Sequence, residues 1–317
     1  TGAAQFARPS AGSWVSYGLG TVNQNMPSFM VLAPSAPYAG TQTWGSDFLP
    51  ACHQGTHVLP GKEPLPNVRP RMAEGGLQQM ELNLRNKLNE IHFKKRAADQ
   101  MLNARIRSFE TAFGMQREAP EAFDLSGETA ATLGLYGIER DTTAGFGWQC
   151  LVARRLAERG VRFLELIDVG SSNNWDSHGN MGDHKKLAKA IDQPIAALIK
   201  DLKSRGMLED TLIVWTGEFG RTPDNTVRGG QAAIGRDHNA KAMNMFFAGG
   251  GVKRGAVIGA TDEIGGEAVE VVHPIRDVHC TMLDLLGLDD NKLTYFHGGR
   301  YKQLSQFGGE VIKEIIA

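Results

Sequence analysis

Residues 147–167, GWQCLVARRLAERGVRFLELI, decide the fold class of this 317-residue chain. The pattern predicts a helix from Gly147 to Glu158, which Gly160 ends. The run from Val161 to Ile167 then has the length and the apolar content of a buried strand. A helix that leads directly into a buried strand is typical of α/β proteins.

The same alternation continues toward the C-terminus. The sequence predicts further strands over 211–216 and 242–247, and helices over 183–205 and 275–286. Strands separated by helices of this length are joined by parallel crossovers. We therefore predict an α/β fold with a mostly parallel sheet.

The N-terminal half has a different character. A short apolar run over 29–33 predicts one more buried strand, and 34–70 is a long excursion rich in Gly, Pro, Ser, Thr and His. Residues 74–117 are predicted to be helical, and we interpret 34–140 as a loop and helical insertion within a single domain over 1–317. The apolar positions at steps of three and four residues are Leu77, Met80, Leu84, Leu88 and Ile91.

Composition argues against two classes of function. Lys and Arg number 34 against 35 Asp and Glu, a net charge of −1, so no basic excess predicts nucleic-acid binding. No apolar run has the length needed to span a membrane. These totals leave the oligomeric state open.

Three polar motifs lie where the predicted strands meet solvent. They are Trp175-Asp176-Ser177-His178, Gly217-Glu218-Phe219-Gly220-Arg221 and Gly235-Arg236-Asp237-His238-Asn239. Ligands of open α/β sheets bind beyond the carboxyl ends of the strands. We therefore expect the three motifs to form one site at the sheet edge.

Carboxylate and imidazole groups together predict a divalent metal site. Asp176 and His178 are two residues apart, so in an extended loop their side chains face the same way. Glu218 directly follows a buried strand, and Asp237 and His238 supply one more group of each kind. Such a set suits zinc or, with more oxygen, manganese, calcium or magnesium.

Arg221 is the predicted contact for an anion, because guanidinium matches the oxygens of phosphate and sulfate. Structural alternatives stay open for each residue. His178 or Asp237 could cap a turn, Glu218 could pair with Arg221, and Asp237 could orient His238 rather than bind metal.

Several strings of this chain together resemble the DUF1501 family of bacterial proteins, and the resemblance covers essentially the whole length. Members are often labelled sulfatases and are similar to the alkaline phosphatase/sulfatase superfamily. The matching strings are Arg8-Pro9-Ser10-Ala11-Gly12-Ser13-Trp14, Asn174-Trp175-Asp176-Ser177-His178-Gly179, Gly217-Glu218-Phe219-Gly220-Arg221-Thr222-Pro223, Gly235-Arg236-Asp237-His238-Asn239 and Ala248-Gly249-Gly250-Gly251-Val252-Lys253.

That superfamily implies a three-layer α/β/α sandwich with one or two divalent metals, which activate a sulfate or phosphate ester for in-line attack. Asp176 and His178 match its first ligand pair, and His238 with Asp237 matches a later one. Glu218 falls where an Asp-His pair begins, but Phe219 stands in place of the histidine. The expected function is a metal-dependent hydrolase of small or polysaccharide sulfate or phosphate esters.

The resemblance also implies an exported, periplasmic or cell-surface protein with residues ahead of Thr1, so the chain is expected to be N-terminally truncated. It would then lack the first core strand and the nucleophile, since Ser10 and Ser13 are interpreted as helix-start residues. The alternative is a degenerate, non-catalytic relative that binds an anionic glycan or a protein partner.

Overall fold

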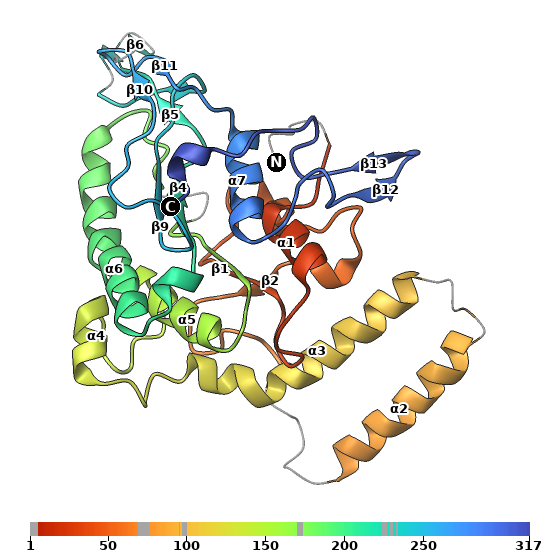
Figure 1. Cartoon of the computed structure of the whole chain (residues 1–317). Helices are drawn as coiled ribbons and strands as arrows, with labels where there is room; N and C mark the ends of the chain where they lie inside the picture. The colour runs from red at the N-terminus through yellow and green to blue at the C-terminus, as the bar shows by residue number, and fades with distance from the viewer. Residues whose placement is uncertain are drawn as a thin grey trace. The chain divides into compact units, whose positions relative to one another are not determined.

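The structure is a computed structural model that describes residues 6–68, 76–94, 96, 100–169, 174–223, 227–228, 231–232 and 234–317 (Figure 1). The chain forms two compact units. Unit 1 comprises Thr1–Ala130 with Glu139–Gly170, and unit 2 comprises Ala131–Ile138 with Ser171–Ala317. Each unit is described by itself below.

Unit 1 is built on a parallel sheet of three strands. Strand β1 (Phe29–Leu32) lies between β2 (Thr56–Val58) and β3 (Phe163–Leu166), with Val31 opposite both His57 and Glu165. All four residues of β1 are buried, as expected for a parallel sheet covered on both faces. The predicted strands at 29–33 and 161–167 are confirmed, whereas β2 lies in the excursion that was predicted to be a loop.

An apolar cluster covers one face of this sheet. Phe29, Val31, Ala33 and Trp44 are its fully buried members, and Phe163 and Ile167 pack against them. Helix α1 (Ala11–Leu19) approaches so closely that a Cβ atom on Gly12 would stand 2.6 Å from Cζ of Phe29.

Two serines, Ser10 and Ser13, make structural hydrogen bonds at the start of α1. Ser10 is its N-cap and accepts from the backbone N–H of Ser13, whose hydroxyl donates to the carbonyl of Gly45 at 3.0 Å. Both serines are buried, so their interpretation as helix-start residues is confirmed.

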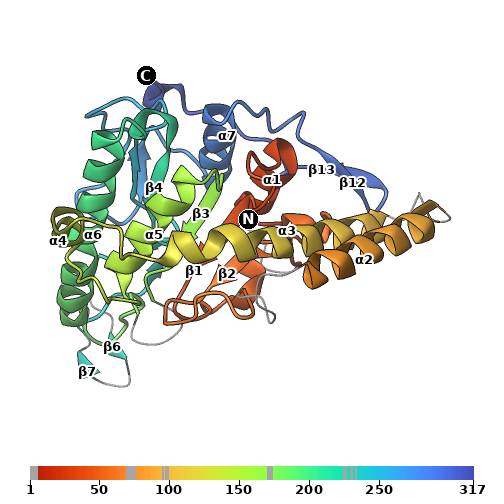
Figure 2. The ribbon, with the colours of Figure 1, turned by 90° about the horizontal axis from the view of Figure 1, so that it is seen from below.

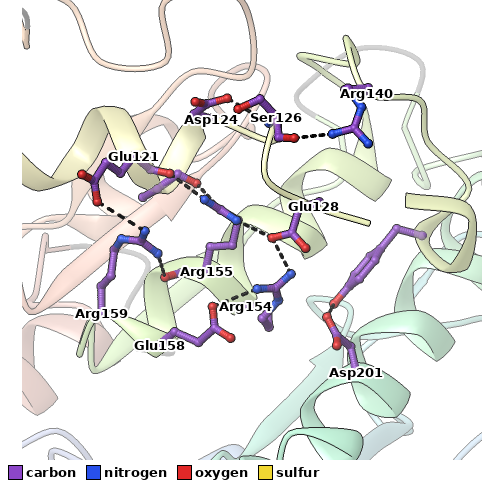
Figure 3. A network of polar contacts seen from close by, with 12 residues as sticks. Glu121, Asp124, Ser126, Glu128, Arg140, Arg154, Arg155, Glu158, Arg159 and Asp201 are labelled. Carbon is purple, nitrogen blue, oxygen red and sulfur yellow. Dashed lines mark hydrogen bonds and ion pairs between the residues drawn. The ribbon is translucent and has the colours of Figure 1, made fainter. Parts of the chain in front are cut away.

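Helix α5 (Phe146–Glu158) packs beside β3 and carries an ion-pair network, which Figure 3 shows. Nη2 of Arg154 lies 2.8 Å from Oε1 of Glu128, and Nη1 of Arg155 reaches the same oxygen. Burial would raise the pKa of Glu128, but hydrogen bonds from the two arginines outweigh it and lower that pKa. The network ties α5 to the segment that precedes α4 (Ala130–Tyr136).

The helical segment of unit 1 is a hairpin of α2 (Leu77–Lys94) and α3 (Gln100–Phe123), which lie side by side in Figures 1 and 2. Helix α3 extends beyond the predicted limit at residue 117 and continues past Pro120 to Phe123, because a proline near the end of a helix interrupts only its last turn. Residues 74–75, 95 and 97–99 of the predicted helix lie outside the described residues.

Unit 2 contains helices α6 (His184–Ser204) and α7 (Ile275–Leu285), both as predicted. Its strands β4 (Ile213–Thr216) and β9 (Met245–Ala248) pair antiparallel, with Val214 opposite Phe247. The expected parallel relation between these two strands is wrong. No helix separates them among the described residues, and antiparallel neighbours need no crossover helix.

The other strands of unit 2 form short antiparallel pairs. They are β5 (Gly220–Arg221) with β8 (His238–Asn239), β6 (Val227–Arg228) with β7 (Gln231–Ala232), β10 (Ala260–Thr261) with β11 (Ala268–Glu270), and β12 (Tyr295–His297) with β13 (Arg300–Lys302). Single turns of 3₁₀ helix cover Gly40–Trp44, Ala51–His53, Met181–Asp183, Leu208–Asp210 and Lys313–Ile315. The fold is therefore mixed α/β, with seven α-helices among the described residues. None of those helices is both long enough and apolar enough to cross a membrane.

Candidate metal centre

Two of the three polar motifs are joined by a short backbone ladder in unit 2. Strands β5 and β8 place Arg221 opposite His238. One step further, the N–H of Thr222 donates to the carbonyl of Asp237 at 2.9 Å, and the hydroxyl of Thr222 accepts from the N–H of Asp237 at 3.0 Å. The ladder brings together side chains that lie about 15 positions apart along the chain.

The third motif is attached to the same ladder by its backbone. The N–H of Arg236 donates to the carbonyl of Ser177 at 3.1 Å. The contact requires a glycine, because a Cβ atom on Gly235 would stand 1.9 Å from the carbonyl oxygen of His178. Backbone contacts therefore set the position of Asp176 and His178 relative to His238.

The loop ahead of Asp176 is held by His184, at the start of α6. Its Nε2 lies 2.8 Å from the carbonyl oxygen of Trp175, and the two rings make an edge contact at 5.1 Å. The side chain of Asn174 accepts from the N–H of Asp176 at 2.9 Å. We find no sequence signal that would have assigned His184 this positioning role.

Asp176, His178 and His238 form a compact group of potential metal ligands. One ligand atom from each lies within 4.8 Å of the others. Oδ1 of Asp176 is 2.9 Å from Nε2 of His178 and 2.9 Å from Nε2 of His238. Among the described residues, no other three potential ligand side chains lie close enough together to share one ion.

Arg221 contacts the same carboxylate. Its Nη1 donates to Oδ1 of Asp176, while its Nη2 donates to Oε1 of Glu218 at 2.9 Å. Burial would raise the pKa of Asp176, but hydrogen bonds from Arg221 and His238 and the charge of Arg221 outweigh it, so the pKa falls to about 2. Asp176 is therefore ionised at neutral pH.

Asp237 lies behind His178 rather than in the ligand group. Its Oδ1 is 3.2 Å from Nδ1 of His178 and accepts from the backbone N–H of His238 at 3.1 Å. Nδ1 of His178 is buried and has no hydrogen-bond partner among the described residues, so the carboxylate of Asp237 acts on the ring as a nearby charge. Carboxylate-backed histidines of this kind are common in metal sites.

Phe219 forms an apolar wall of the site. Its ring centroid lies 4.3 Å from that of His238, and Cζ of Arg221 lies 5.5 Å from the Phe219 centroid. Phe219 therefore limits the orientations of the side chains of His238 and Arg221.

The site differs from its sequence prediction at two residues. Glu218 has a side chain that is 57% exposed and pairs with Arg221, as the structural alternative proposed, and it is not in the ligand group. Asp237 contacts the ring of His178, whereas the alternative placed it beside the ring of His238.

The chemistry of the donor set fits one divalent cation. Ligand atoms of a tetrahedral zinc site are about 3.4 Å apart, because each lies ~2.0–2.2 Å from the ion. The two distances of 2.9 Å are shorter, so the group must open by roughly half an ångström to admit an ion. Two imidazole nitrogens with one carboxylate favour a transition metal over calcium or magnesium.

Comparison with known proteins places the whole chain in one family. The family model described as DUF1501, protein of unknown function, matches residues 1–316. No curated protein and no solved structure matches the chain. The match spans all three motifs of the candidate centre, and the chain therefore belongs to the DUF1501 family.

Proposed function

We propose that this protein is a metal-dependent hydrolase of sulfate or phosphate esters. The observation that carries the proposal is the group Asp176, His178 and His238. Their ligand atoms lie within 4.8 Å of one another, and backbone hydrogen bonds hold the segments that carry them. A divalent cation held there would act as a Lewis acid on an ester oxygen. The substrate class rests on the family resemblance and on the arginine beside the ligands.

In this proposal Arg221 orients the anion. Its side chain is 18% exposed, and its guanidinium contacts both Asp176 and Glu218. With a cation held by Asp176, Nη1 of Arg221 would be available to a sulfate or phosphate oxygen, while Glu218 would keep Nη2 in place. Guanidinium suits such oxygens because its planar donors match their spacing.

Asp237 and Phe219 are assigned positioning roles. With a metal bound, Asp237 would accept from Nδ1 of His178, 3.2 Å away, and so orient the ring, and Phe219 limits rotation of the His238 ring by direct packing. Both side chains act through a ligand and need not contact the substrate.

The proposal extends to relationship and location. We infer that the mixed α/β fold is a divergent alkaline phosphatase/sulfatase-type sandwich, and that the protein acts after export, in the periplasm or at the cell surface. Both inferences rest on the family resemblance of the motifs.

One observation favours a second candidate, a non-catalytic relative that binds an anionic glycan or a protein partner. The Asp176 oxygen that a cation requires already accepts a hydrogen bond from Arg221. If that ion pair persists, the site is a polar cluster and not a metal centre.

Turnover distinguishes the two candidates. We would assay nitrophenyl sulfate and nitrophenyl phosphate with the purified full-length protein, before and after treatment with a chelator and after re-addition of zinc or manganese. The hydrolase proposal predicts turnover that is lost with chelator, restored by metal and at least 100-fold lower in His238→Ala. Glu218→Ala, the matched variant outside the ligand group, should retain its metal. Absence of turnover with both esters under metal-replete conditions would favour the binding protein.

A further inference from the structure

Helix α2 exposes an apolar stripe whose residues take no part in the candidate metal centre. Its five large side chains are between 58% and 70% exposed although they lie on one face of an 18-residue helix. A continuous stripe of this kind is normally buried against another element. The stripe consists of Leu77, Met80, Leu84, Leu88 and Ile91.

The opposite face of α2 is the one that meets α3. Gln78 donates to Gln116 at 3.1 Å. Arg85 lies at the edge between this face and the stripe, with its guanidinium 5.8 Å from the ring of Phe109. The remaining partly buried positions of α2 are Leu82, Asn89 and Phe93, which share this face at helical spacing. Packing within the hairpin therefore leaves the stripe uncovered, and Figures 1 and 2 show the hairpin projecting from the sheet of unit 1.

The stripe is symmetric about its centre. Leu77 and Ile91 lie seven residues before and after Leu84, and Met80 and Leu88 lie four residues before and after it. Two copies of α2 that run antiparallel would therefore place Leu77 against Ile91, Met80 against Leu88 and Leu84 against itself. Such self-complementarity is the requirement of a two-fold symmetric interface.

Charges beside the stripe agree with the same arrangement. Glu81 and Arg85 lie on the same flank, three residues before and one residue after Leu84. In an antiparallel pair like flanks meet, and Glu81 of one copy then lies about 3 Å along the axis from Arg85 of the other, at 1.5 Å per residue. Lys87 lies on the other flank, where its own copy is roughly 9 Å away along the axis.

The apolar area is adequate for a weak but specific dimer. Five side chains at this exposure present on the order of 500 Å² per copy, so a symmetric pair would bury roughly 1,000 Å², near the lower limit for specific interfaces. A single exposed patch of that size is also at the upper end of what monomeric proteins show.

We propose that the exposed stripe of α2 is a homodimer interface, in which two copies of this chain pair their α2 helices antiparallel about Leu84. The sedimentation coefficient of the full chain across micromolar concentrations tests it. Wild type should be a reversible dimer, and Leu84→Glu, which sets two carboxylates against each other at the two-fold axis, should weaken association at least tenfold. Asn86→Glu adds the same charge at an exposed position away from the stripe and should leave the dimer intact. A monomeric wild type, or a dimer that Leu84→Glu does not weaken, overturns the proposal.

Cross-linking tests the direction of the pairing independently of stability. Under mild oxidation Leu84→Cys should give a covalent dimer, whereas Leu77→Cys and Ile91→Cys should each stay uncoupled alone but couple when mixed. The native cysteines Cys52, Cys150 and Cys280 are free, so wild type measures the background. Self-coupling of Leu77→Cys, which indicates a parallel pair, or no coupling at Leu84→Cys would contradict the proposal.

Discussion

The parallel sheet of unit 1 and the candidate metal centre of unit 2 are built in opposite ways. In β1 every side chain from Phe29 to Leu32 is at most 1% exposed, and apolar burial holds the strand in place. In the centre, by contrast, the side chain of Asp176 is 22% exposed and that of His238 is 48% exposed, and short backbone contacts position them. The first region therefore supplies stability, whereas the second supplies polar groups whose loss costs little folding free energy.

The largest effect that separates the two regions should come from Phe29→Ala. The change removes a buried ring from the apolar cluster and should lower the free energy of unfolding by about 3–5 kcal/mol. Urea unfolding measures the loss, and elemental analysis of the folded fraction should show unchanged metal content. Phe307→Ala is the matched control, because Phe307 is 83% exposed and its removal should cost less than about 0.5 kcal/mol. A similar loss in both variants would contradict the assignment of the core.

Glu165 sharpens the comparison, because it places an acid inside the stable region. It shares the face of Phe163 and Ile167, and burial raises its pKa from the ordinary 4.5 to about 7. Between these values the folded state binds more protons than the unfolded state, so wild-type stability falls as pH rises through this window. Glu165→Gln removes the titrating group. The free energy of unfolding of this variant, relative to that of wild type, should therefore increase from pH 4 to pH 8 by up to roughly 3 kcal/mol. A difference that is the same at both pH values would show that folding does not raise the pKa of Glu165.

A smaller effect is expected at Asp237, because we propose that its side chain orients His178 and does not itself bind the metal. Asp237→Asn should weaken metal affinity about 10- to 100-fold, which is the usual cost of removing a carboxylate behind a histidine ligand. Competition with a coloured chelator measures it. Asp192→Asn in α6 carries the same change at an exposed position and should leave affinity unchanged. Equal affinity in the two variants would remove Asp237 from the centre.

Much of the fold could be predicted because buried strands and helices have apolar patterns that are visible in the sequence. Strand β1 is a continuous apolar run, and β3 is apolar apart from Glu165. Helices α5 and α6 end two residues before Gly160 and Gly206, close to their predicted limits. Strand β2 was not predicted, because Thr56-His57-Val58 is short and mostly polar. The direction of β4 against β9 was not predicted either, since the composition of a short apolar strand does not reveal whether its neighbour runs parallel.

For the candidate site, the sequence indicated which residues come together better than it indicated which side chains contact one another. The spacing of Asp176 and His178 and their approach to His238 followed from the three motifs. The partners of Glu218 and Asp237 did not, because a carboxylate near both an arginine and a histidine can pair with either. The choice depends on a backbone ladder between residues far apart in sequence.

The central claim is tested most directly by counting ions. Chelator-stripped wild type titrated with Zn²⁺ in a calorimeter should bind one ion per chain, and Glu218→Ala should bind it with similar affinity. Asp176→Asn, which keeps the shape of the side chain but removes its charge, should bind at least 100-fold more weakly. Equal binding by wild type and Asp176→Asn, or no binding by wild type, would contradict the account.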